Sequence, residues 1–198
     1  MPEIIDKAQV ANFEKYLRKT KREGIENLIE FIKKSDFYTA PASTRYHSSC
    51  PGGLLQHSIN VYECLLNKKK TSTLWSHVLE DIEEESLIII ALLHDICKTY
   101  FYTTSWRNAK NEETGKWEKV PYYTVEDKIP YGHGEKSVMM IEEYIKLKPI
   151  ERYAIRWHMG FTEPKENYNS LSAAITKYPI ILAMHEADLE ATYVLENQ

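Results

Sequence analysis

The chain has 198 residues, of which 43% are hydrophobic and 27% are charged, and its formal net charge is −4 at pH 7. This length suits one domain over residues 1–198, with a core that needs no disulfides to hold it together. The composition excludes wholesale disorder. It also disfavours a dedicated nucleic-acid binder, because there is no basic excess to neutralise a phosphate backbone.

The compartment is indicated by apolar runs and cysteines. The longest apolar run, Leu87–Leu93, is far shorter than the about 20 residues that span a bilayer. The first residues lack the basic and apolar stretches of a secretory signal. The cysteines, Cys50, Cys64 and Cys97, form no CxxC pair and leave one unpaired, which is typical of a reducing compartment. We expect a cytoplasmic protein that does not contact a membrane.

Hydrophobic spacing predicts a mostly helical chain. Apolar residues recur at intervals of three and four, the period of one buried helical face. On this basis we expect helices over residues 12–21, 25–32, 54–65, 84–96, 135–146 and 150–157, and from residue 171 onward with a break at Pro179. The helix over 84–96 is apolar on nearly all sides, so we expect it at the centre of the core.

A β-hairpin is expected at about residues 100–131, inserted into the helical body. Residues 100–104 and 117–125 are rich in aromatic and β-branched side chains, and 111–115 between them has turn chemistry. We expect the aromatic rings to pack the hairpin onto its domain. The alternative is that they stack on a nucleobase.

The strongest chemical feature is the pair His94–Asp95, directly after the apolar run. Desolvation makes an imidazole and a carboxylate costly there unless something compensates them. A divalent metal would compensate both, whereas a capped helix end is the structural alternative. Most of the seven glycines also lie close to a histidine, which indicates either close backbone approach or ordinary helix punctuation.

Other histidines and an aspartate are expected to point inward. His57 shares a helical stripe with Val61 and Leu65, and His133 lies just before a predicted helix. His158 follows the apolar Ile155 by three residues, and Asp188 lies on an otherwise apolar face. Any one of them alone is more often a core or capping residue than a ligand. Together with His94–Asp95 they are hard to explain as separately satisfied groups.

The order His57, His94–Asp95, Asp188 resembles the signature of the HD-domain metal-dependent phosphohydrolases. Residues 52–58 resemble the family's first-histidine segment, and 92–98 resemble its usual HDIGK stretch, with Cys97 where a glycine is common. The resemblance covers about residues 41–195. It implies an all-α fold, an HD-domain helical bundle that here carries the hairpin insertion.

The resemblance also implies a ligand set. His57, His94 and Asp188 would bind one metal, His133 and His158 a second, and Asp95 would bridge them. The alternative is a one-metal site that His133 and His158 only surround or that they use to contact substrate. Mixed nitrogen and oxygen ligands suit two divalent transition-metal ions from among Mn, Fe, Co, Ni and Zn.

Cations near this site are candidates for contacting phosphate. In the family the lysine that matches Lys98 contacts phosphate, so Asp95 and Lys98 are the expected catalytic residues. Helix capping is the alternative role for Lys98. Arg156, Lys136 and Arg45 are weaker candidates, because each could be an ordinary surface charge.

The resemblance implies hydrolysis of a phosphate ester, a monoester or a diester, by a metal-bound hydroxide. The expected partner is a nucleotide or a related small molecule, with nucleic acid considered only as a substrate and room left for a homodimer. Two rival functions stay open. They are a di-iron oxygenase of the HD type and a non-catalytic module that binds a nucleotide or nucleic acid.

Overall fold

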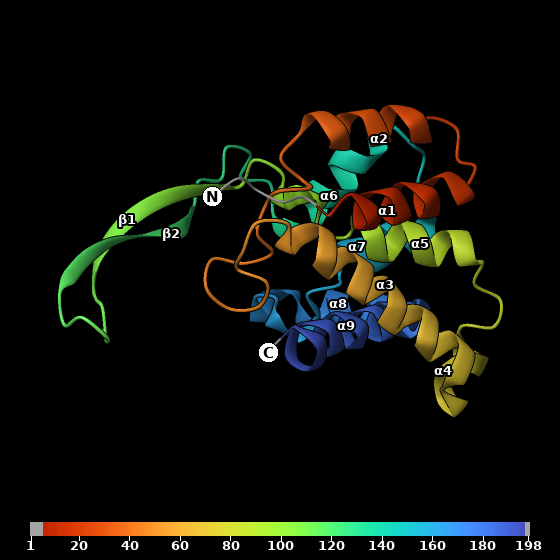
Figure 1. Cartoon of the computed structure of the whole chain (residues 1–198). Coiled ribbons are helices and arrows are strands. Elements are labelled where there is room, and N and C mark those ends of the chain that lie inside the picture. Colours follow the sequence, from red (N-terminus) through yellow and green to blue (C-terminus); the bar gives the residue numbers. More distant parts are fainter. Residues whose placement is uncertain (1–5, 197–198) are drawn as a thin grey trace.

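The computed structural model describes residues 6–196 and confirms the all-α body with a hairpin insertion (Figure 1). The α-helices are α1 (Lys7–Lys19), α2 (Ile25–Lys34), α3 (Gly53–Thr71), α4 (Thr73–Val78), α5 (Glu84–Leu93), α6 (His133–Glu142), α7 (Pro149–Arg156), α8 (Tyr168–Lys177) and α9 (Ile180–Glu190). Short 3₁₀ turns follow α5 and α7, and a π-helical turn, Ala191–Leu195, continues α9. Most helices begin and end within about four residues of the expected positions, but α1 begins five residues earlier than expected, α3 ends six residues later, and α4 was not expected.

The core is built around α5. Every residue from Ser86 to Leu93 is buried, as expected for a helix that is apolar on all sides. Helices α1, α3 and α7 pack against it. The helix ends at Leu93 rather than at the predicted Ile96, because the chain turns at His94 and Asp95 before a 3₁₀ turn, Ile96–Lys98.

Helix α3 crosses the body between α5 and α9. It contacts both of them, and its buried residues include the whole stripe expected from Leu54 to Leu65. The helix enters from Gly52, whose φ of 81° lies in the left-handed region that favours glycine. At its other end Lys68 pairs with Glu186 and Glu190 of α9, which fixes the two helices side by side.

The hairpin consists of β1 (Tyr102–Lys110) and β2 (Trp117–Val125), paired antiparallel from Tyr102↔Val125 to Lys110↔Trp117. It projects away from the helical body in Figure 1. Trp106 and Trp117 are 64% and 71% exposed. The expectation that the rings pack the hairpin onto its domain is therefore wrong for these two, because the strands extend beyond the helices.

No helix in the described part of the chain is both long and apolar enough to cross a membrane.

Candidate metal centre

Six side chains from separate helix ends meet at one end of the body. We call them the His/Asp cluster. Its members are His57 in α3, His94 and Asp95 directly after α5, His133 at the start of α6, His158 after α7 and Asp188 in α9. Neighbouring imidazole rings lie 4.9 to 5.3 Å apart. The structure thus brings together all the residues proposed as ligands from the sequence.

Two glycines allow the backbone to approach closely around the cluster. A Cβ on Gly134 would lie 2.2 Å from the carbonyl oxygen of Arg156, so only glycine lets the start of α6 meet the end of α7. A Cβ on Gly53 would lie 1.9 Å from the carbonyl oxygen of Ser48. These contacts favour close approach over ordinary punctuation as the reason for glycine here.

Asp95 lies at the centre of the cluster. Its Oδ1 is 2.8 Å from Nε2 of His133 and 3.6 Å from Nε2 of His158. Its Oδ2 is 3.4 Å from Nε2 of His94 and 3.8 Å from Nε2 of His57. One carboxylate oxygen therefore faces each of the two groups of histidines that the resemblance assigns to separate metals.

His57 lies between two carboxylates. Its Nε2 is 3.2 Å from Oδ1 of Asp188, and its Nδ1 is 3.0 Å from Oε1 of Glu196. Burial disfavours the charged imidazole, but the hydrogen bonds to Asp188 and Glu196 outweigh burial and raise the pKa of His57 to about 9. Despite burial, the same contact with His57 lowers the pKa of Asp188 below its ordinary value.

The residues fit a metal because buried ring nitrogens, among them two of the His/Asp cluster, have no hydrogen-bond partner among residues 6–196. Nδ1 of His94 lies 2.8 Å from the carbonyl oxygen of Ala91, and Nδ1 of His158 lies 2.7 Å from that of Ile155. A carbonyl only accepts, so each Nδ1 must carry the proton that it donates. Each Nε2 then presents a lone pair to the cluster, and neither has a hydrogen-bond partner among residues 6–196.

Such orphaned buried acceptors are rare in proteins unless something binds them. Burial lowers the pKa of His94 and keeps its imidazole neutral, the form that binds metals. Groups of three donors that could hold an ion overlap across the cluster, among them His57, His94 and Asp188, and His94, Asp95 and His158. The donors are imidazole nitrogens and carboxylate oxygens, which suit divalent transition metals.

Lys98 lies beside Asp95 at the edge of the cluster. Its Nζ is 2.6 Å from Oδ2 of Asp95 and also donates to the carbonyl oxygen of Ala42 at 2.7 Å. Burial opposes the charged ammonium, but the Asp95 carboxylate raises the pKa of Lys98 above its ordinary value. The Asp95 carboxyl, also buried, has its pKa held well below the usual range by Lys98 and by the imidazoles.

A cavity of about 550 Å³, which we call the cluster cavity, opens onto these groups. Lys98 and Arg45 both line it, as do Tyr46 and Tyr193. Tyr46 and Tyr193 are 77% and 67% exposed, so they form part of its outer rim.

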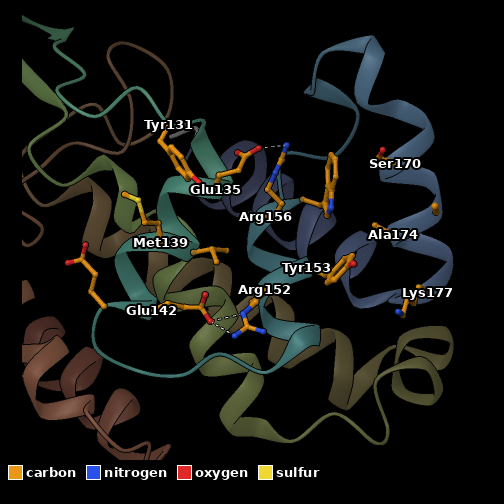
Figure 2. Close-up of a pocket in the computed structure, with 14 residues that line it drawn as sticks. Tyr131, Glu135, Met139, Glu142, Arg152, Tyr153, Arg156, Ser170, Ala174 and Lys177 are labelled. Atoms are coloured by element: carbon orange, nitrogen blue, oxygen red, sulfur yellow. Dashed lines mark hydrogen bonds and ion pairs between the residues drawn. The ribbon is translucent and has the colours of Figure 1, made fainter.

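Two of the cations proposed from the sequence lie elsewhere. Arg156 pairs with Glu163 at 2.9 Å and with Glu135, and it lines a separate cavity (Figure 2). Lys136 is buried, pairs with Asp127 at 2.7 Å and does not line the cluster cavity. Both cations already have carboxylate partners, so their charges are used within the protein.

Three further residues around the cluster, Glu196, His47 and His185, are not in the ligand set proposed from the sequence. Glu196 accepts from His57, from Nδ2 of Asn60 at 2.9 Å and from the hydroxyl of Ser48 at 2.8 Å. The rings of His47 and His57 lie 4.9 Å apart, and Nδ1 of His185 donates to the carbonyl oxygen of His158 at 2.8 Å. No spacing rule could find Glu196, because it lies far from His57 in sequence.

Cys97 is a buried neighbour of the cluster. Its Sγ lies 3.3 Å from Nδ1 of His133. Burial raises the pKa of the Cys97 thiol to about 12. With Asp95 and His133, Cys97 also forms one of the groups of donors that could hold an ion.

Comparison with known proteins gives one family. The family model described as HD domain matches residues 54–192, which is more than half of the chain and includes the whole His/Asp cluster. No curated protein and no solved structure gives a significant match.

Proposed function

This chain belongs to the HD domain family, most of whose members are metal-dependent hydrolases, and we propose that it hydrolyses a phosphate ester of a nucleotide or a related small molecule. The observation that carries this proposal is the pair of buried, unpartnered Nε2 atoms on His94 and His158, on either side of the Asp95 carboxylate. A protein that only bound a ligand would have no need of them.

We assign His57, His94 and Asp188 to one ion and His133 and His158 to a second, with Asp95 shared by both. This division follows the two sides of the Asp95 carboxylate. When bound, two divalent ions would lower the pKa of a water and stabilise the attacking and leaving oxygens of a phosphoryl displacement.

The protein residues orient these groups. Each Nδ1 of His94 and His158 is held by a carbonyl of its own helix, which aims the opposite nitrogen into the cluster. Glu196 does the same for His57. These three ligands are therefore oriented before a metal binds, and little of their conformational freedom remains to be lost.

Lys98 is the proposed phosphate contact. Its ammonium is 2.6 Å from Asp95 and lines the cluster cavity, so it can stabilise negative charge that grows on a phosphoryl oxygen. Arg45 lines the same cavity, is exposed, and lies 5.7 Å from the ring centre of Tyr46. We assign it to the outer, more distant part of a substrate.

The size of the cavity supports a nucleotide. A volume of about 550 Å³ lies within the range of small-molecule sites, and Tyr46 and Tyr193 on its rim offer ring faces for a base. Whether the substrate is a monoester or a diester depends on whether the cavity accommodates a second ester group on the phosphate.

The test is a screen for phosphate release from nucleoside monophosphates and for cleavage of a chromogenic phosphodiester, with Mn, Fe, Co, Ni or Zn added separately. We expect metal-dependent hydrolysis of at least one substrate by the wild-type chain and none by Asp95→Ala. Oxygen consumption by the iron-loaded protein without hydrolysis would replace this proposal with an oxygenase. Tight nucleotide binding without turnover in every metal would make it a binding module.

A further inference from the structure

The hairpin is an arm on which two large aromatic side chains, Trp106 and Trp117, are exposed. Its strands have nine residues each, so at about 3.4 Å per residue the arm is about 30 Å long. It projects from the helices (Figure 1), and Trp106 and Trp117 are largely exposed. An isolated two-stranded hairpin is only marginally stable in water, and apolar side chains that gather on one exposed face mark an interaction surface.

The two faces of the arm differ in chemistry. Because side chains alternate along a strand, the pairs Tyr102↔Val125, Thr104↔Tyr123, Trp106↔Pro121, Asn108↔Lys119 and Lys110↔Trp117 share one face. We call this the aromatic face: it carries four aromatic rings and two lysines and has no carboxylate. The opposite face carries Arg107, Glu118 and Tyr122.

The aromatic face begins at the edge of the cluster cavity. The hydroxyl of Tyr102 donates to the carbonyl oxygen of Ala42 at 2.9 Å, and Nζ of Lys98 donates to the same oxygen. Tyr102 also lies 6.5 Å, ring centre to ring centre, from Tyr123 further along the arm. In the sequence the arm is inserted between Lys98 and His133, both of which line the cavity.

We propose that the aromatic face binds single-stranded nucleic acid and leads one of its ends to the His/Asp cluster. Bases would stack on Trp106, Trp117 and Tyr123, and Lys110 and Lys119 would contact phosphates, as on other single-strand platforms. Hydrolysis of the bound strand rests on the proposed function of the cluster. The binding itself does not.

Charge favours a polyanion over a second copy of this chain. The whole chain carries a net charge of −4, yet the aromatic face presents lysines without acids. Two such faces packed on each other would bring lysines together without counter-charges. With about two phosphate contacts, affinity should fall with salt along a logarithmic slope of only about −1.4.

The experiment titrates the full chain into fluorescein-labelled dT12 and rU12 in the presence of chelator, so that no turnover occurs, and follows anisotropy. Thymidine monophosphate is tested as a competitor. We expect the 12-mers to bind at least tenfold tighter than the mononucleotide. Trp106→Ala and Trp117→Ala should each weaken the 12-mers about tenfold, and Tyr122→Ala, the matched control on the opposite face, should change affinity less than twofold.

The proposal is wrong if the 12-mers bind no tighter than the mononucleotide, or if Tyr122→Ala weakens binding as much as the tryptophan variants do. It is also wrong if sedimentation shows a dimer that Trp106→Ala dissociates, since the arm would then join two copies. Mononucleotide hydrolysis without 12-mer binding overturns this inference alone. Binding of the 12-mers in chelator, together with no hydrolysis of any substrate in the metal screen, supports this inference and overturns the proposed function instead.

Discussion

Two cavities of this protein differ in how the polar groups around them are satisfied. The larger one, about 950 Å³ between α6, α7 and α8, contains the ion pairs Arg156–Glu135 and Arg152–Glu142 (Figure 2). The cluster cavity is smaller, about 550 Å³, but it lies against buried ring nitrogens that have no partner in the described part of the chain. Chemistry is therefore indicated by unsatisfied donors and acceptors rather than by volume.

Removing the central carboxylate of the His/Asp cluster should have the largest effect on metal binding and turnover, whereas removing a carboxylate from the larger cavity should have none. Asp95→Ala takes a ligand from both proposed ions, so we expect loss of bound metal and a fall in turnover of more than about a thousandfold. The measurements are metal content and phosphate release. Glu142→Ala, which removes a carboxylate from the larger cavity, is the matched control and should change neither. Normal metal content in Asp95→Ala would contradict the assignment.

Lys98 should separate catalysis from metal binding. We expect Lys98→Ala to keep its metal but to lose about a hundredfold in kcat, because a buried positive charge beside the phosphate is gone. The control is Arg152→Ala in the larger cavity, which should leave kcat unchanged. Equal kcat for Lys98→Ala and wild type would show that Lys98 has a structural role and does not contribute to the reaction.

Glu196 should affect metal affinity more than folding. In Glu196→Ala, His57 loses the acceptor that orients its ring, so we expect metal affinity to fall about 10- to 100-fold, measured by competition with a chelating dye. Glu196→Gln keeps an acceptor oxygen and should recover most of the loss. Glu190→Gln, altering a carboxylate that pairs with Lys68, is the control. Wild-type affinity in Glu196→Ala would show that the contact is incidental.

Arg156 should matter for stability and not for chemistry. Arg156→Ala leaves the carboxylate of Glu163, 9% exposed, without its arginine partner, so we expect a loss of about 2 kcal/mol in the free energy of unfolding. Urea denaturation measures this, and kcat of the metal-loaded variant should equal that of wild type. A fall in kcat without a matching loss of stability would show that Arg156 contributes to the reaction.

Much of the fold and the cluster could be predicted, because both depend on local signals. The segment 84–96, apolar on nearly all sides, predicts a buried helix, and His94–Asp95 near its end needs compensation. Charged side chains were harder to place. Arg156 and Lys136 lie near the ligands in sequence, but they form ion pairs with Glu135 and Asp127 and do not line the cluster cavity.

The role of the arm and of Glu196 could not be predicted from the sequence. Strand patterning predicts a hairpin but does not say whether Trp106 and Trp117 meet the helices, because that depends on the direction in which the strands leave the body. Glu196 reaches His57 only because α9 packs along α3. Contacts of this kind between distant segments follow from tertiary packing and leave no local pattern.

Metal content per chain, measured by plasma mass spectrometry on protein purified without chelator or a nickel column, would decide whether the cluster holds two ions. We expect close to two transition-metal ions per wild-type chain after reloading, with the second ion lost in His133→Ala. One ion or none in the wild-type chain would contradict the assignment of His133 and His158 as ligands.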